Sequence, residues 1–244
     1  MLNIEHIYKT LGEFQLKDIN FKIKKGEYFV ILGPTGTGKS VILETIAGMY
    51  KPDKGKIYFD GKEINNLYPE DREVGFVYQD YLLFPHLSVR ENIVFGLKRK
   101  KFSKKEIKKK LYNIASNFQI EHLLDRKPKT LSGGEQQRVA IARALITSPK
   151  ILLFDEPLSA LDPSTKKKFI DILKEIHKKT ESIIIHVTHD FYEALELADK
   201  IAVMNKGNMV QIGTPDEIFY KSNSSFVKNF IGVVPFEKRI NYVV

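Results

Sequence analysis

Residues 33–40 read GPTGTGKS and lie between two apolar runs, YFVIL at 28–32 and VILETIAGM at 41–49. Three glycines and a proline in eight residues fit neither a strand nor a helix interior, where one glycine costs about 1 kcal/mol relative to alanine. The first run is continuous and apolar, as in a strand buried on both faces. The second repeats at helical spacing, at Val41, Ile42, Thr45, Ile46 and Met49. The sequence therefore predicts a loop between a strand and a helix.

This loop has the chemistry needed to hold phosphate. It matches G-x-x-x-x-G-K-[ST], in which glycines let backbone N–H groups converge on phosphate oxygens at the positive end of the next helix. Lys39 supplies a charge for the β- and γ-phosphates, and Ser40 a hydroxyl for Mg²⁺. The strand–loop–helix context favours nucleotide binding over a plain glycine-rich turn. The predicted contacts are Gly33, Pro34, Thr35, Gly36, Thr37, Gly38, Lys39, Ser40 and Val41.

A second candidate site follows the apolar run ILLF at 151–154, which ends in Asp155 and Glu156. Carboxylates at the end of a buried strand are costly to desolvate without a purpose. If this strand lies beside the strand at 28–32, Asp155 reaches the Mg²⁺ shell and Glu156 polarises a water aimed at the γ-phosphate. The alternative is a surface carboxylate pair that ends a strand.

Composition narrows the class of protein. The chain of 244 residues is 43% hydrophobic and 28% charged, as in an ordinary globular protein. It has no cysteine, which excludes disulfides, thiolate metal sites and cysteine nucleophiles. No apolar run reaches the roughly 18–20 residues of a membrane-spanning helix, and the start lacks a signal-peptide pattern. We expect a cytoplasmic protein, unless a partner tethers it.

The net charge of +9 makes nucleic acid and an anionic membrane surface candidate partners. Much of the excess lies in KRKKFSKKEIKKK at 98–110. Lysines there fall mostly between apolar positions at helical spacing, which favours the solvated face of an amphipathic helix. The lysines are not interleaved with the aromatic residues of a single-strand binding platform, so no nucleic acid is expected.

Strand-like runs alternate with helical patterns through most of the chain, which predicts an α/β layered fold. Strand signals vanish between about 80 and 147, so we expect a helical insertion in the α/β core. The predicted helices there are 89–97, 104–118 and 134–147. Further predicted elements are a strand at 182–187, a helix from Pro163 capped by Asp162, a hairpin at 201–213 and short helices in 215–220 and 225–231. One domain is expected over 1–232, with a short tail at 233–244 and no regulatory domain.

At 131–145 the chain reads LSGGEQQRVAIARAL and resembles the ABC transporter ATPases, whose signature is LSGGQ followed by such a helix. Glu135 replaces the commoner glutamine. Other family motifs are matched in order: GPTGTGKS is similar to Walker A, Gln79 to the Q-loop glutamine, ILLFDE to Walker B, 159–162 to the D-loop and His189 to the switch histidine. The resemblance implies an α/β P-loop NTPase (RecA-like) core with an antiparallel β subdomain and a helical signature subdomain.

The resemblance also implies partners and roles. Two chains pair head to tail with each ATP between one Walker A and the other chain's signature, at Ser132, Gly133 and Gly134. Glu156, His189 and Gln79 are expected to be catalytic, and Ser40, Gln79 and Asp155 to hold Mg²⁺. An integral membrane permease dimer is expected to dock near residues 81–93 at the cytoplasmic face of the membrane, with a solute-binding protein acting indirectly.

Three assignments keep alternatives. Leu82, Leu83, Phe84 and Pro85 are either the lining of the docking groove or ordinary core. His186 and His189 suggest a metal pair by spacing, although a γ-phosphate contact by His189 is favoured because a strand turns them to opposite sides. Leu11 stands where the family places an aromatic residue against adenine, and Phe14 or Tyr8 could substitute for it.

The absence of a fused membrane domain favours an importer, and motif details such as Thr35 are most similar to the molybdate/tungstate group. Importers of sulfate, polyamine, sugar or iron stay open as alternatives. A soluble ABC ATPase directed to nucleic acid is the rival from another class.

Overall fold

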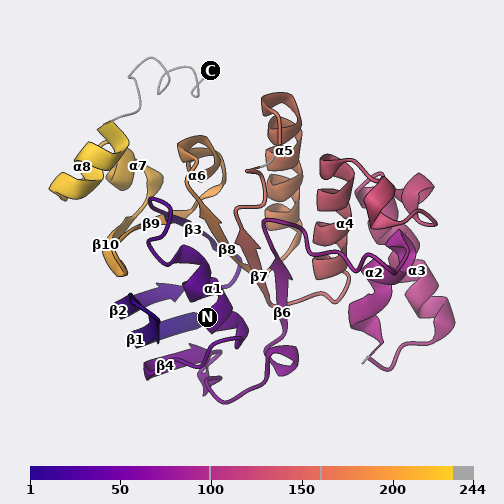
Figure 1. Cartoon of the computed structure of the whole chain (residues 1–244), viewed down its shortest axis with the longest axis horizontal. Helices are drawn as coiled ribbons and strands as arrows, with labels where there is room; N and C mark the ends of the chain where they lie inside the picture. Colours follow the sequence, from indigo (N-terminus) through magenta and orange to yellow (C-terminus); the bar gives the residue numbers. More distant parts are fainter. Residues whose placement is uncertain (99, 160, 233–244) are drawn as a thin grey trace. The chain divides into compact units, whose positions relative to one another are not determined.

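The computed structural model describes residues 1–98, 100–159 and 161–232 (Figure 1). The chain divides into two compact units. The first unit consists of residues 1–72 together with those from 170 onward, and the second of residues 73–169. Ala160, in the predicted D-loop, and the predicted tail at 233–244 lie outside the described residues.

An antiparallel sheet of four strands, in the order β2-β1-β4-β5, forms one part of the first unit. Side chains of β2 alternate, with Leu16, Ile19, Phe21 and Ile23 buried and the lysines between them exposed. Such alternation is typical of a sheet with one covered face. The strands are β1 (Leu2–Leu11), β2 (Phe14–Ile23), β4 (Lys54–Phe59) and β5 (Lys62–Glu63).

The other strands of the first unit centre on β3 (Tyr28–Leu32), which pairs in parallel with β8 (Ile183–Thr188) and with β9 (Lys200–Asn205). Every residue of β3 and β8 is buried, which explains the continuous apolar run of β3 and the largely apolar sequence of β8. The last strand, β10 (Asn208–Gly213), is antiparallel to β9. The helices of this unit are α1 (Lys39–Ala47), α6 (Phe191–Leu197), α7 (Pro215–Phe219) and α8 (Ser225–Gly232).

The second unit combines two parallel strands with helices. β6 (Val74–Val77) pairs with β7 (Ile151–Asp155). The helices are α2 (Val89–Val94), α3 (Lys104–Asn117) and α4 (Gly133–Leu145), and each begins with a serine capping box, at Ser88, Ser103 and Ser132. In such a box the serine and a glutamate three residues later satisfy backbone N–H groups that the helix start leaves unpaired. A further helix, α5 (Pro163–Lys179), runs through the boundary of the two units.

Most predicted elements are confirmed, including the α/β content, the three helices between 80 and 147, and the hairpin. The strand predicted at 182–187 begins one residue later. The first helix was predicted too long, because Gly48 adopts a left-handed conformation with φ +87 and ends it before Met49, which is 45% exposed. The lysines of α3 are exposed as predicted, except Lys110, which is half-buried. Aromatic rings do lie beneath two of them: Lys108 over Tyr112 and Lys110 over Phe102.

Candidate functional site

The predicted phosphate loop leaves the end of β3 and enters α1 at Lys39. Two of its glycines are required by close neighbours. A Cβ at Gly33 would lie 2.6 Å from the backbone oxygen of Met204, and one at Gly38 would lie 2.2 Å from the ring of Phe14. Gly38 also has φ +97, a conformation that other residues rarely adopt. The loop is therefore held close to both β9 and β2.

Lys39 lies inside this loop rather than in solvent, with only 5% of its surface exposed. Its Nζ donates to the backbone oxygens of Gly33 at 2.8 Å and Pro34 at 3.0 Å. The hydroxyl of Thr37 donates to the same Pro34 oxygen at 2.9 Å. The ammonium is thus placed where the loop can present positive charge to a phosphate.

His189 lies at the same sheet edge as the phosphate loop. The β3–β8 register pairs Leu32 with Thr188, so Gly33 and His189 each come one residue after the last paired position. The side chain of His189 is exposed. In contrast, His186 is fully buried and contacts the hydroxyl of Tyr28 through Nδ1 at 2.9 Å. The two histidines therefore point to different environments, as the γ-phosphate interpretation requires.

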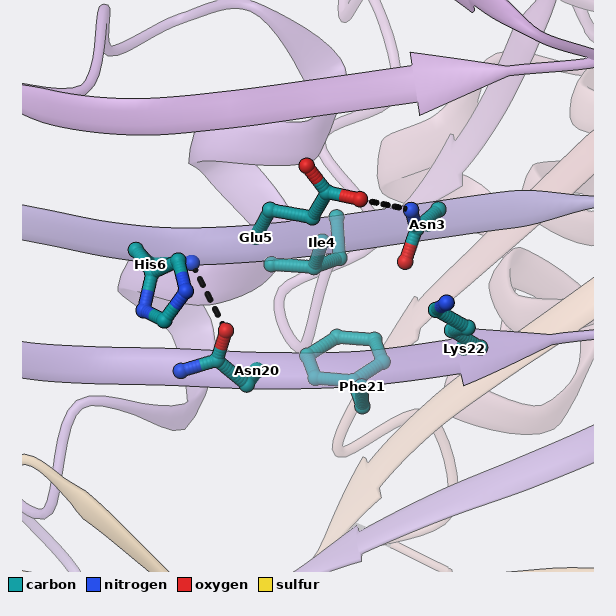
Figure 2. Close-up of a pocket in the computed structure, with 7 residues that line it drawn as sticks. All are labelled: Asn3, Ile4, Glu5, His6, Asn20, Phe21 and Lys22. Atoms are coloured by element: carbon teal, nitrogen blue, oxygen red, sulfur yellow. Dashed lines mark hydrogen bonds between the residues drawn. The ribbon is translucent and has the colours of Figure 1, made fainter.

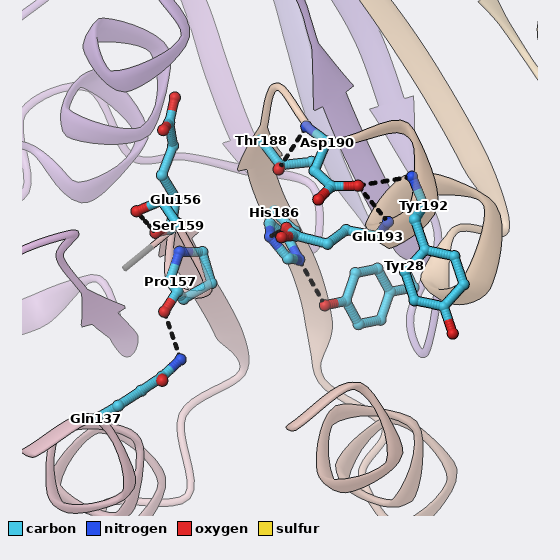
Figure 3. A network of polar contacts seen from close by, with 10 residues as sticks. All are labelled: Tyr28, Gln137, Glu156, Pro157, Ser159, His186, Thr188, Asp190, Tyr192 and Glu193. Atoms are coloured by element: carbon cyan, nitrogen blue, oxygen red, sulfur yellow. Dashed lines mark hydrogen bonds and ion pairs between the residues drawn. The ribbon is translucent and has the colours of Figure 1, made fainter. Parts of the chain in front are cut away.

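Gln79, Asp155 and Glu156 belong to the second unit and come together at one edge of its strands. The register pairs Val77 with Phe154, so Gln79 and Glu156 each lie two residues beyond that pair. Glu156 has φ +44, and its backbone oxygen accepts from Ser159 N at 3.2 Å and Ser159 Oγ at 2.9 Å. Figure 3 shows its carboxylate pointing away from this turn. The turn is therefore closed through the backbone oxygen of Glu156.

The predicted signature residues begin α4 in the second unit. Ser132 caps the helix, and its N–H donates to Glu135 Oε2 at 2.7 Å while Glu135 N donates to Ser132 Oγ at 3.3 Å. The hydrogen bond from the Ser132 backbone lowers the pKa of Glu135. Gly133 and Gly134 follow, and a Cβ added at either would make only ordinary van der Waals contact, at 3.9 Å and 3.6 Å. Glu135 thus caps the start of α4, where its carboxylate accepts the hydrogen bond from the Ser132 N–H.

Two functional contacts in the second unit were not predicted from the sequence. Gln137 of α4 is fully buried, and its side chain donates to the backbone oxygen of Pro157, directly after Glu156. Figure 3 shows this hydrogen bond. The contact ties the signature helix to the chain that follows the candidate catalytic glutamate. Nothing in the sequence pattern distinguishes this buried glutamine from its neighbour Gln136.

The second unpredicted contact holds the start of the docking segment, the name used here for residues 81–93. Tyr81 and Leu82 have φ values of +59 and +41, a costly conformation for two successive residues with side chains. Arg143 of α4 donates to Leu82 O at 2.8 Å and to Tyr81 O at 3.0 Å, and its guanidinium lies 5.4 Å from the Phe84 ring centroid. Leu82 is 54% exposed whereas Phe84 is half-buried. The signature helix therefore fastens a segment that exposes an apolar residue.

Among the candidate aromatic residues for adenine, Phe14 is the one in contact range of the phosphate loop, at Gly38. Leu11 and Tyr8 are both half-buried. Lys54 Nζ lies over the Tyr8 ring, 5.9 Å from its centroid. Leu11 thus replaces the aromatic residue of the family, while Phe14 lies beside the phosphate loop.

A pocket in the first unit has no predicted function. A shallow pocket along β1 and β2 is lined by Asn3, Ile4, Glu5, His6, Asn20, Phe21 and Lys22 (Figure 2). In it the Asn20 side chain accepts from His6 N at 2.8 Å. No predicted site residue lines this pocket. Within the described ranges, no group of three or more His, Cys, Asp or Glu side chains is placed to hold a metal ion.

Comparison with known proteins decides the family. The sequence pattern of the family described as ABC transporter matches residues 16–159. The chain belongs to the ABC transporter family. Within the described part of this ABC ATPase, no helix is both long and apolar enough to cross a membrane.

The relatives of this ABC ATPase cover nearly all of the chain. It is 49% identical over 232 residues, 95% of its length and 67% of the relative's, to a molybdate/tungstate import ATP-binding protein of Pyrococcus horikoshii. It is 44% identical to a probable sulfate/thiosulfate import ATP-binding protein of Chlorella vulgaris, over 94% of this chain and 98% of that one.

Solved structures agree with this fold. A dimeric ATP-binding cassette in a post-hydrolysis state with ADP and Pi superposes with a TM-score of 0.78 at 34% identity, over 88% of this chain and 99% of that one. The cbiO1 subunit of a Clostridium perfringens ABC transporter complex gives 0.81 at 34% identity, over 99% and 97%. The P-loop NTPase fold is thus confirmed.

Proposed function

We propose that this chain is the ATP-hydrolysing subunit of an importer for molybdate or tungstate. The observation that carries the ATPase assignment is the phosphate loop, with the Lys39 ammonium held against the Gly33 and Pro34 oxygens and His189 leaving the neighbouring strand at the same edge. Family membership supports the coupling of this ATPase to transport.

Catalysis is divided among a few side chains. Glu156 orients and polarises the attacking water, and His189 contacts the γ-phosphate, where charge develops during phosphoryl transfer. The Ser40 hydroxyl, the Gln79 amide oxygen and the Asp155 carboxylate are hard oxygen donors of the kind that Mg²⁺ prefers. Mg²⁺ held there with ATP would neutralise charge on the phosphate oxygens.

Two copies of the chain form each ATP site. The signature residues Ser132, Gly133 and Gly134 begin a helix of 13 residues, whose N-terminal N–H groups and dipole favour an anion. We propose that this terminus closes on ATP held by the phosphate loop of a second copy, in a two-fold dimer. The relative solved with ADP and Pi is itself described as dimeric, which supports this arrangement.

The membrane partner is a permease dimer that docks on the segment 81–93 at the cytoplasmic face. The exposure of Leu82 and the clamp from Arg143 support docking over a purely structural role, because the segment is both apolar at its surface and fixed to the signature helix. A solute-binding protein would act through the permease rather than on this subunit.

The support for the solute comes from relatives. Three relatives named as molybdate/tungstate import proteins are 47–49% identical, whereas relatives named for sulfate/thiosulfate, maltose and glycerol 3-phosphate import are 44% identical. This margin favours molybdate or tungstate as the solute.

Glu156→Gln tests the mechanism, because the amide keeps the shape of the side chain but cannot act as a base. We expect preserved ATP binding, a trapped dimer in size-exclusion chromatography and phosphate release reduced at least about a hundredfold. Lys39→Ala should instead weaken ATP binding itself. Undiminished phosphate release by Glu156→Gln would contradict the assignment.

Transport is tested with the permease reconstituted in proteoliposomes. ATP hydrolysis should rise with a binding protein loaded with molybdate or tungstate and not with sulfate or maltose. Stimulation by DNA or RNA that falls steeply with salt would instead indicate a nucleic-acid-directed ATPase.

A further inference from the structure

The first unit buries three polar side chains that the proposed reaction does not use. Tyr28 and His186 are fully buried, and Glu193 is 1% exposed. The Tyr28 hydroxyl lies 2.9 Å from His186 Nδ1, and His186 Nε2 lies 3.2 Å from Glu193 Oε2. Figure 3 shows the three side chains converging from β3, β8 and α6. Burying a carboxylate and an imidazole together is expensive unless each finds a partner.

The two contacts of His186 differ in kind. His186 Nε2 and Glu193 Oε2 lie within ion-pair distance, but they are not hydrogen-bonded to each other. Burial and the charge of Glu193 raise the pKa of Tyr28 well above its ordinary value, so its hydroxyl keeps its proton and donates to His186 Nδ1. The three groups therefore form one continuous line of contacts, with a hydrogen bond from Tyr28 to His186 and an ion-pair contact from His186 to Glu193.

Two of these side chains, His186 and Glu193, lie on either side of the loop that carries His189. His186 lies three residues before His189, and Glu193 lies four residues after it in the first turn of α6. Asp190 caps α6 by accepting from Tyr192 N at 2.7 Å and Glu193 N at 3.3 Å, while its own N–H donates to Thr188 Oγ1 at 3.0 Å. The loop is thus hydrogen-bonded next to His189, whose side chain is exposed.

The contacts among Tyr28, His186 and Glu193 also link the His189 loop to the phosphate loop. The contact of Tyr28 joins the beginning of β3 to β8, and the end of β3 leads directly into Gly33. A shift of α6 against β8 would therefore move His189 relative to the phosphate loop. Displacing a catalytic group by even about 1 Å can cost about a hundredfold in rate.

We propose that Glu193 and His186 are positioning residues that hold His189 in the orientation in which it reaches the γ-phosphate. The inference rests on the proposed role of His189 and adds two residues, buried beneath the loop, that touch neither ATP nor Mg²⁺. A purely structural role would make the same residues stabilise the fold without any specific effect through His189.

A double-mutant cycle on the full-length chain separates these two roles, since residues that act through one another are not additive. Glu193→Gln keeps the size of the side chain and removes its charge. We expect kcat to fall about tenfold with the dissociation constant of ATP changed less than about twofold. In the His189→Ala background, the same substitution should change kcat less than about twofold.

Glu196→Gln is the matched control, because Glu196 is on the same helix but pairs with Lys174 instead. It should leave kcat unchanged in both backgrounds. Tyr28→Phe removes only the hydrogen bond to His186 Nδ1 and provides a second variant if Glu193→Gln does not fold. It should lower kcat about threefold, again only when His189 is present.

The outcomes distinguish this inference from the proposed function. An equal fall of kcat on Glu193→Gln with and without His189 overturns the positioning role and leaves the ATPase mechanism intact. Unchanged kcat on Glu193→Gln overturns it as well. Unchanged kcat on His189→Ala overturns the γ-phosphate contact, and the positioning role with it.

Discussion

The turn of the β9–β10 hairpin provides the sharpest stability test. Lys206 and Gly207 have φ values of +43 and +80, as in the two-residue turns that suit twisted hairpins. A Cβ at Gly207 would lie 1.9 Å from the backbone oxygen of Gln15 in β2. The Gly207 oxygen also accepts from Lys17 N at 2.8 Å, so β2 and the turn are in direct backbone contact.

Gly207→Ala should therefore cost more than its conformation alone. The left-handed backbone costs an alanine about 1–2 kcal/mol. The clash falls on backbone, which cannot rotate away, so the turn must move and the hydrogen bond to Lys17 N, worth about 1 kcal/mol, is lost. We expect the free energy of unfolding to fall by about 3 kcal/mol, measured by urea denaturation followed by circular dichroism.

Gly61→Ala is the matched control. Gly61 has φ +79, nearly the same as Gly207, but an added Cβ would meet nothing within 4 Å. It should lose only the conformational cost of about 1–2 kcal/mol. The Gly207 N–H also donates to Thr37 O of the phosphate loop at 3.3 Å, so Gly207→Ala should weaken ATP binding and Gly61→Ala should not. Equal losses of stability in the two variants would refute the argument.

Three other predictions use the same kinds of contact. Arg72→Lys should lower the free energy of unfolding by about 3 kcal/mol in urea denaturation, because a lysine cannot replace the guanidinium fork that donates to Thr45 O and Ile46 O at the end of α1. Asn92→Ala should abolish stimulation by the permease while basal phosphate release persists, since its fully buried amide bonds the Phe84 N–H and three backbone oxygens of the docking segment. The Ser164 hydroxyl, followed by Thr165, holds the pKa of Asp162 below its ordinary value, so the stabilisation by this cap is complete above about pH 3.9 and is lost as pH falls through the folded pKa. The difference in melting temperature between the wild type and Asp162→Ala should accordingly shrink in acid.

The local elements were predictable because their causes are local. The apolar run at 28–32, the glycines after it and the helical spacing from Val41 each act within a few residues. The prediction is wrong at Met49, because Gly48 adopts a left-handed conformation that ends the helix before it. Family motifs extended the prediction to the signature and to His189.

The missed contacts join residues far apart in the chain. In the sequence, Gln137 and Arg143 look like ordinary polar residues of a helix. Their hydrogen-bond partners, Pro157 and Leu82, lie 20 and 61 residues away. Consecutive left-handed residues at Tyr81 and Leu82 leave no mark in composition either, since neither is a glycine. Such features depend on which elements pack together, which periodicity does not encode.

By itself the sequence determined that a strand leads through a phosphate-binding loop into a helix, since hydrophobic spacing and glycine content act along the chain. It also supplied the ABC motifs in their order. Only the tertiary structure decided that Lys39 lies inside that loop, that Gly207 contacts β2, and that Tyr28, His186 and Glu193 meet in the interior of the first unit. These are contacts between separate strands and helices, and strand register and helix packing determine which side chains can touch.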